Sequence, residues 1–181
     1  MRTYISILRG INVGGHRMIK MDALRQLYAD LKFGNVKTYI QSGNVVFQSS
    51  DSDVENIEKI ITKSINDKFG FEVPVIVLEF ERLKQIASNN PFLSDLSKKP
   101  LYFHITFLSS CPDSENSKKL LETKFENEDY SIIDNVVYLY CPSGYSNSKL
   151  TNSFLENKLR VQATTRNWNT TNELILIAEK L

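Results

Sequence analysis

The sequence has almost no excess of charge of one sign, and this absence narrows the range of partners. Its 22 Lys and Arg residues are balanced by 21 Asp and Glu residues, so the formal net charge at pH 7 is +1. A near-neutral chain has no overall electrostatic attraction for nucleic acid, a membrane surface or an acidic partner. We therefore expect no membrane partner, and the composition gives only weak support for nucleic-acid binding.

Cysteine, histidine and long apolar runs are also scarce. The two cysteines, Cys111 and Cys141, form no CxxC motif, and the chain contains two histidines. These numbers argue against a zinc site and a disulfide framework, so we expect no metal ion and a cytoplasmic location. No apolar run approaches the roughly 20 residues of a membrane span. The apolar stretch at the N-terminus is too short for a signal peptide.

Apolar residues make up 41% of the chain, which is enough for a core and excludes a disordered chain. Charge and glycine, by contrast, are unevenly spread. Residues 1–50 contain seven basic and two acidic residues, a local net charge of +5, and five of the seven glycines lie within the first 43 residues. The basic part of the chain is therefore also the part that needs unusual backbone conformations.

The order of predicted elements in the first half is βαββαβ, which is typical of the ferredoxin-like unit. A Ser52/Glu55 capping box starts its second helix, Gly34 fits the left-handed position after its first, and Pro74 confines its last strand to an edge. The predicted elements are strands at 3–9, 36–41, 44–48 and 73–78, with helices at 21–32 and from Val54 to Gly70.

The second half predicts a similar series. It contains a helix at 80–88, a strand at 101–107, a helix capped by Asp113, a hairpin at 130–133 and 136–141, a helix at 150–159, a short strand at 162–164 and a last helix capped by Thr170 and Glu173. At an offset of 91, Tyr39 matches Tyr130, and Asn44-Val45-Val46 matches Asn135-Val136-Val137. We predict an α+β fold of two ferredoxin-like halves related by internal duplication, residues 1–90 and 100–181, the second with an added C-terminal helix.

The first candidate site is the segment Leu8–Arg17. Gly10 and Gly15 have the spacing of the outer glycines of a Walker A loop, but His16 and Arg17 follow where Lys and Ser or Thr are required. A simpler anion-binding loop remains open, because consecutive glycines expose backbone N–H groups between basic side chains. Its residues are Arg9, Asn12, Gly14, Gly15, Arg17 and Lys20. The alternative is a tight turn with solvated arginines.

Two further segments contain polar residues. Gln41, Ser42 and Asn44 surround a predicted hairpin turn, and ordinary turn chemistry explains them. Residues 164–171 place Arg166 and Asn167 beside Trp168, the only tryptophan. Such a set can bind a planar or anionic ligand, or Trp168 can anchor the last helix to the core.

We expect the glycine loop and the Ser42-Gly43-Asn44 turn to lie at opposite ends of the sheet. The glycine loop would then meet Arg166, Asn167 and Trp168 across the two halves. The predicted function is binding of a small anionic or phosphate-bearing ligand. The alternatives are a nucleic-acid-binding module, which the central strand 44–47 does not favour because it lacks a run of aromatics, and protein interaction through an exposed edge strand.

Three strings occur together in this order: Leu8–Gly15, Ser42–Phe47 and Thr165–Thr170. In this combination the chain resembles the bacterial family called domain of unknown function 1697. The resemblance implies a cytoplasmic protein of two ferredoxin-like halves, and it implies no activity, cofactor or catalytic residue. Members often carry Lys after the double glycine, where this chain has His16.

Overall fold

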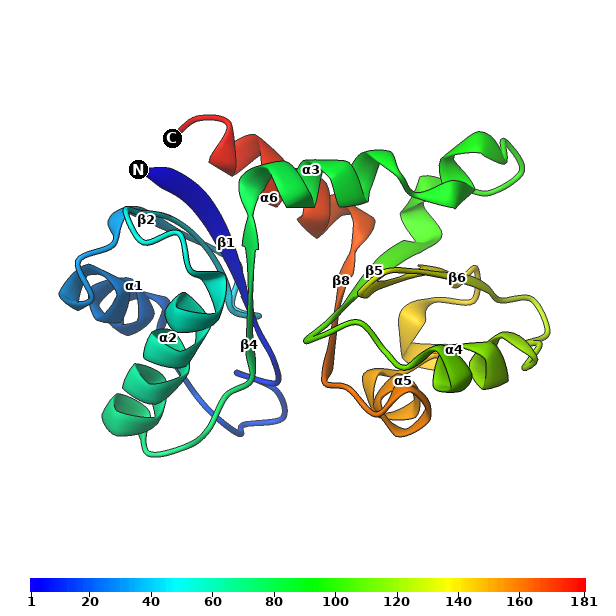
Figure 1. Cartoon of the computed structure of the whole chain (residues 1–181), viewed down its shortest axis with the longest axis horizontal. Helices are drawn as coiled ribbons and strands as arrows, with labels where there is room; N and C mark the ends of the chain where they lie inside the picture. The colour runs from blue at the N-terminus through cyan, green and yellow to red at the C-terminus, as the bar shows by residue number, and fades with distance from the viewer. The chain divides into compact units, whose positions relative to one another are not determined.

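The computed structural model describes all residues from Met1 to Leu181. It divides into two compact units, shown in Figure 1. The first consists of Met1–Gln85 together with Glu173–Leu181, and the second of Ile86–Asn172. None of the helices is long and apolar enough to span a membrane.

The first unit has the predicted βαββαβ order. Its four strands form an antiparallel sheet in the order β2-β3-β1-β4, and both helices cover one face of that sheet (Figure 1). A further helix, α3, follows the edge strand β4 without a loop. The elements are β1 (Arg2–Leu8), α1 (Met21–Asp30), β2 (Gly34–Tyr39), β3 (Asn44–Ser49), α2 (Val54–Phe69), β4 (Val75–Glu79) and α3 (Phe80–Ser88).

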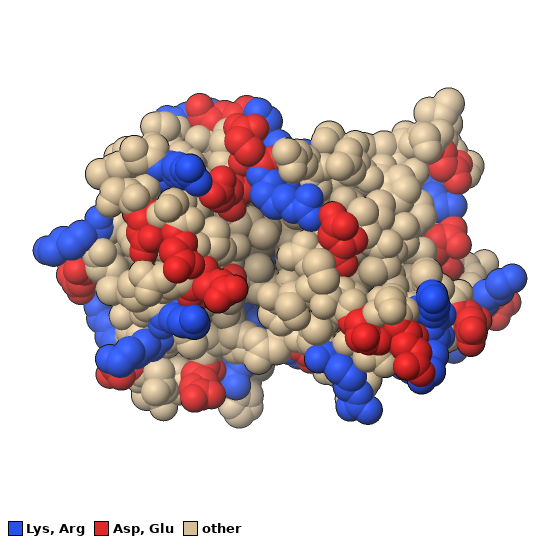
Figure 2. All heavy atoms as spheres, in the orientation of Figure 1, with Lys and Arg blue, Asp and Glu red and all other residues tan.

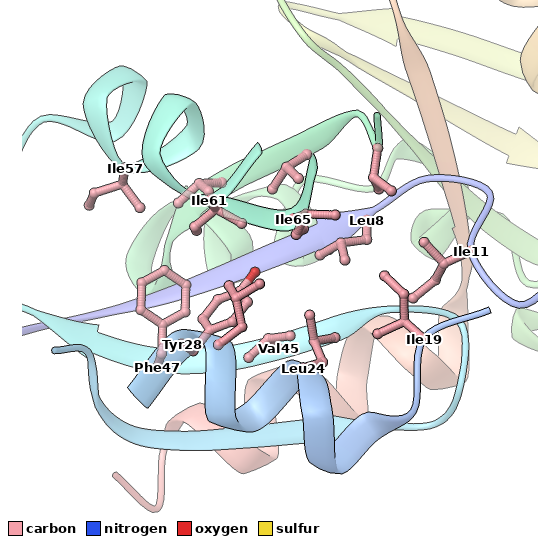
Figure 3. Packing of buried hydrophobic residues seen from close by; sticks show 14 of the residues in the cluster. Leu8, Ile11, Ile19, Leu24, Tyr28, Val45, Phe47, Ile57, Ile61 and Ile65 are labelled. Atoms are coloured by element: carbon pink, nitrogen blue, oxygen red, sulfur yellow. The ribbon is translucent and has the colours of Figure 1, made fainter. Parts of the chain in front are cut away.

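The core of this unit follows from strand alternation and helical spacing. Leu8 of β1 points to the helices, where Ile57, Ile61 and Ile65 of α2 recur every four residues (Figure 3). Tyr4, two periods of the alternation earlier on β1, belongs to the same buried cluster. The one polar pair in this layer is satisfied, because the hydroxyls of Ser6 and Tyr28 are hydrogen-bonded at 2.7 Å. Burial raises the pKa of Tyr28, so its hydroxyl stays protonated. On the opposite face of the sheet, aliphatic side chains are also buried: Ile5, Ile7, Val46, Ile76 and Leu78.

The second unit repeats this topology. Its antiparallel sheet has the order β6-β7-β5-β8, and its two helices cover one face (Figure 1). The predicted fold class is therefore confirmed. The elements are β5 (Phe103–Leu108), α4 (Ser114–Leu121), β6 (Asp129–Ile133), β7 (Val136–Tyr140), α5 (Asn152–Leu159) and β8 (Ala163–Asn167). The last helix, α6 (Trp168–Ala178), begins in this unit, and its residues from Glu173 onward belong to the first. Three short 3-10 helices lie at Pro91–Ser94, Pro100–Tyr102 and Tyr145–Asn147.

The residue register of the repeat differs from the predicted offset. Asn44 of β3 pairs with Ile7 at the end of β1, and Val136 of β7 pairs with Phe107 at the same place in β5. Asn44 therefore corresponds to Val136 rather than to Asn135. The predicted match was wrong by one residue there, because the β2–β3 turn has four residues and the β6–β7 turn has two.

Several predicted boundaries were also wrong. The closing strand of the second unit is Ala163–Asn167 rather than a short strand at 162–164. Asn167 caps α6, accepting from the backbone N–H of Thr170 at 2.7 Å, so Thr170 is not the cap. Asp53 rather than Ser52 caps α2. After α1, the left-handed residue is Lys32 and not Gly34.

Candidate functional site

The β1–α1 loop and the β2–β3 turn lie at the same end of the first sheet. The backbone N–H of Leu8 donates to the carbonyl of Gly43 at 2.8 Å. The prediction that they occupy opposite ends was therefore wrong. β1 and β3 are antiparallel neighbours, so the C-terminal end of β1 lies beside the start of β3, directly after the turn.

Gly43 allows this close approach. A Cβ atom at this position would lie 2.7 Å from Leu8 Cβ and 2.8 Å from Ile11 Cδ1. Its backbone φ of +80° is also a conformation that residues other than glycine rarely adopt. Gly43 thus packs against the loop between β1 and α1. This loop and the β2–β3 turn together close one end of the core (Figure 3).

The side chain of Asn12 joins the loop to the β2–β3 turn. Its Nδ2 donates to the carbonyl of Ile19 at 3.0 Å and to the carbonyl of Gln41 at 2.8 Å, while its Oδ1 accepts from the N–H of Ile19 at 2.8 Å. One amide therefore closes the loop at both ends and joins it to the β2–β3 turn. Asn12 itself has a φ of +55°, which asparagine tolerates better than most residues.

The double glycine forms a tight turn within this loop. His16 N–H donates to the carbonyl of Val13 at 2.9 Å, and Gly14 and Gly15 both have positive φ. Two consecutive left-handed residues are the requirement of a type I′ turn. This geometry explains why both positions are glycine, and it places the turn on the exposed side of the loop.

The cationic side chains around the loop have no acidic partners in their own segment. No Asp or Glu occurs between Arg9 and Lys20, and the next acidic residue, Asp22, pairs with Arg25. Arg17 and Lys20 are exposed and form no ion pair. Figure 2 shows Lys and Arg interspersed with Asp and Glu over the face in view. Arg17 and Lys20 are therefore a local uncompensated charge.

The start of α1 adds to this positive potential. Lys20 occupies the N-cap position and makes no side-chain hydrogen bond to the helix. Helices favour Ser, Thr, Asp or Asn at the N-cap, and a cation there opposes the helix dipole. The backbone N–H groups of the first turn are left without a capping side chain. Such a helix start is suited to an anion.

Arg17 has an unusual backbone conformation. Its φ is +48°, and its Nη1 atom comes within 3.5 Å of the point that a Cβ atom would occupy on Gly10. The side chain therefore folds back over the beginning of the loop. A left-handed conformation at an arginine costs about 1 kcal/mol, and strain of this kind often marks a functional position.

The predicted third site segment is mainly an element of the second sheet. Arg166 lies on β8 and is 9% exposed, and its Nη1 donates to the carbonyl of Thr165 at 2.9 Å and to Thr164 Oγ1 at 3.2 Å. Burial lowers the pKa of Arg166 to about 10, so it remains charged at neutral pH. Asn167 caps α6, and Trp168 packs edge-on against Phe103 with ring centroids 5.9 Å apart.

The contacts described for these three residues give each of them a structural role in the second unit. Trp168 is partly buried, as expected of an anchor for α6. The fold brings the glycine loop and the β2–β3 turn together, whereas the meeting of the glycine loop with Arg166, Asn167 and Trp168 stays a prediction.

The second unit also contains a polar cluster that sequence reasoning missed. Thr165 Oγ1 is hydrogen-bonded to Thr106 Oγ1 at 2.7 Å, to Tyr145 Oη at 3.1 Å and to Asn152 Oδ1 at 2.7 Å. His104 stacks on Tyr145 with ring centroids 5.0 Å apart. Threonines on strands give no sign of such a cluster, since β-branched residues are common there. No group of three or more His, Cys, Asp or Glu residues is placed to hold a metal ion.

Fold and motifs together define the class of protein: an α+β protein of two ferredoxin-like units with a glycine-rich loop after its first strand. The chain belongs to the family described as "Protein of unknown function (DUF1697)", whose model matches residues 1–138. The matched region contains the glycine loop and the β2–β3 turn, and it ends before Arg166.

A solved structure supports the fold over the whole chain. The conserved bacterial protein SP0830 from Streptococcus pneumoniae is similar with a TM-score of 0.77 and 22% sequence identity, over 98% of each chain. A comparison with curated proteins gave no match. At this identity the likeness shows the fold alone.

Proposed function

We propose that the first unit binds a small anionic or phosphate-bearing ligand at the loop between β1 and α1. The observation that carries the proposal is the uncompensated charge of Arg17 and Lys20 beside an uncapped helix start. A protein gains nothing in stability from a cation at the N-cap, and an anion bound there would reverse the sign of that interaction. Gly14 and Gly15 keep the approach to these groups free of side chains.

Asn12 has a positioning role in this proposal. Its three hydrogen bonds fix the ends of the loop, so the cationic groups are held in place before a ligand arrives. A preorganised loop loses less conformational entropy on binding than a mobile one.

The test is titration calorimetry with inorganic phosphate. Replacing Arg17 by Ala removes a charge-assisted contact and should weaken binding by roughly 10- to 100-fold. The matched control is Lys124→Ala, which removes an exposed lysine of the second unit and should leave the affinity unchanged. Absence of phosphate binding to the unaltered protein would refute the proposal.

The substitution Lys20→Ser is expected to change the stability of the protein and its affinity for phosphate in opposite directions. Lys20 has the extended backbone conformation of an N-cap, with φ −69° and ψ 137°, so serine can cap α1 there. We expect this variant to be more stable by about 1 kcal/mol and to bind phosphate more weakly. A loss of affinity accompanied by a gain in melting temperature cannot be attributed to unfolding.

The RNA-recognition alternative lacks a binding surface of the usual kind. Sheets that bind RNA present aromatic side chains on the face away from the helices. In the first unit this face carries Ile5, Ile7 and Val46, which are aliphatic and buried. A basic loop alone would give only salt-sensitive, sequence-independent binding.

Strand addition at the β4 edge is also disfavoured. The backbone N–H of Val77 points away from β1 and donates to Glu58 Oε1 of α2 at 2.7 Å. In the second unit, Ala163 N–H of the edge strand β8 donates to Glu156 Oε1 at 2.9 Å. On both edge strands, β4 and β8, one outward-pointing backbone N–H therefore already donates to a glutamate side chain.

A further inference from the structure

Three exposed apolar residues occur in the loop between β1 and α1 and in the β2–β3 turn. Val13 is 65% exposed, Met18 is 61% exposed and Ile40 is 49% exposed. Single apolar residues on a surface are ordinary, but a group of them beside polar residues marks a binding surface. The question is whether these three form a group.

The Asn12 hydrogen bonds bring together the chain segments that carry these three residues. Val13 follows Asn12 in the chain, Met18 precedes Ile19, and Ile40 precedes Gln41. The residues Asn12, Ile19 and Gln41 are joined directly by the Asn12 side chain at 2.8–3.0 Å. Each apolar residue is thus the immediate chain neighbour, about 3.8 Å between Cα atoms, of one of the three residues that these hydrogen bonds join.

Ile40 is the most informative of the three. Its φ is +50°, a left-handed conformation that is a clear outlier for a β-branched residue. Asparagine or glycine would adopt this conformation at lower cost. Burial does not compensate Ile40 for the strain, because half of its side chain remains exposed. An exposed, strained isoleucine at this position indicates that its apolar surface has a use outside the folded core.

Cations and apolar side chains alternate on the same loop. Arg17 lies next to Met18 in the chain, and Lys20 follows the buried Ile19. A ligand that bears an anionic group and an apolar body could place the anion at Arg17 and Lys20 while its body covers Val13, Met18 and Ile40. Inorganic phosphate satisfies only the first set of groups.

We infer that this site takes an organic phosphate with an apolar or aromatic body rather than a free inorganic anion. The inference rests on the proposed function and specifies its ligand class. Charge complementarity places the phosphate, and the area of the three apolar side chains contributes the additional affinity.

The experiment compares inorganic phosphate with phenyl phosphate by titration calorimetry. We expect phenyl phosphate to bind at least tenfold more tightly to the unaltered protein. Met18→Gln and Ile40→Asn should each reduce this preference severalfold and leave the affinity for inorganic phosphate unchanged. Ile40→Asn should also raise the melting temperature, because asparagine relieves the backbone strain. Leu96→Gln, which alters a 97% exposed leucine of the second unit, is the control and should change neither affinity.

The possible failures are distinguishable. Equal affinities for phosphate and phenyl phosphate would overturn the inference and leave the proposed function standing. Binding of neither compound would overturn both. A preference for phenyl phosphate that persists in Met18→Gln and in Ile40→Asn would place the apolar contact elsewhere and so overturn the inference.

Discussion

Gly43 joins the two motifs of the first unit, and its substitution should be costly. An added methyl group would meet Leu8 Cβ at 2.7 Å and Ile11 Cδ1 at 2.8 Å, both in the core. Over-packing costs about 1–3 kcal/mol, and the left-handed backbone adds about 1 kcal/mol. We therefore expect Gly43→Ala to destabilise the protein by about 2–4 kcal/mol in urea denaturation.

Gly70 provides the control for this substitution. It has nearly the same φ, +79°, but no atom lies within 4 Å of the position of its missing Cβ. Gly70→Ala should therefore show only the backbone cost, about 1 kcal/mol. Equal losses for the two variants would mean that close packing at Gly43 contributes nothing.

The residues of the site differ in how far sequence reveals them. Asn12, Gly14 and Gly15 are evident from composition, because turns favour these types. Ile40 is not, since no propensity predicts a β-branched residue in a left-handed conformation. The meeting of Asn12 with Gln41 follows from the antiparallel pairing of β1 and β3.

At the scale of elements, Glu58 protects the edge strand β4 by accepting from Val77 N–H. Burial raises the pKa of Glu58, and the hydrogen bond from Val77 opposes this. Glu58→Gln retains an acceptor oxygen and removes the half-buried charge, so we expect stability at pH 7 to be unchanged or slightly higher. Glu58→Ala leaves the Val77 donor without its partner and should cost about 1–2 kcal/mol.

Both variants are compared by thermal and urea denaturation with Glu55→Ala, which alters a mostly exposed side chain of the same helix. That control should change stability by less than about 0.5 kcal/mol. A Glu58→Gln variant as unstable as Glu58→Ala would show that the charge, and not the hydrogen bond, stabilises the edge.

Element order was predictable because it depends on apolar periodicity, which survives many substitutions. The residues at which elements begin and end were harder to predict. The residues of β8 that follow Ala163 are Thr164, Thr165, Arg166 and Asn167, and such a polar strand has no alternating apolar signal. Thr170 and Glu173 have the spacing of a capping box, yet Asn167 occupies the cap position because the strand continues directly into α6. Local motifs compete at such a junction, and pairing of β8 with β5 decides between them.

The whole molecule consists of two units of one topology whose sequences differ in the loop that follows the first strand of each. The loop after β1 holds three glycines and several cations, whereas the corresponding strand β5 is followed by Ser109, Ser110 and Cys111. Likewise, the Ser6–Tyr28 pair of the first unit has no equivalent at Thr106, which instead bonds to Thr165. Duplication therefore accounts for the shared scaffold, and the glycine-rich loop occurs in the first unit alone.

The pH dependence of stability provides a test on the molecule as a whole. His104 lies on β5, stacks on Tyr145, and its Nδ1 lies 3.2 Å from the carbonyl of Tyr102. Burial lowers the pKa of His104, and the Tyr102 carbonyl partly opposes this effect. The unfolded chain therefore takes up a proton near pH 6.5 before the folded protein does, so stability is full above that pH and decreases as the pH falls.

We expect the melting temperature to fall between pH 7.5 and pH 5.5, and His104→Phe should reduce this fall because phenylalanine retains the stacking on Tyr145 without titrating. The control is His16→Asn, which removes the other histidine, an exposed residue of the glycine loop, and should keep the dependence of the unaltered protein. An unchanged pH dependence in His104→Phe would show that burial of this imidazole does not couple folding to protonation. Other titrating groups, such as Glu58, contribute equally to both proteins and cancel in the comparison.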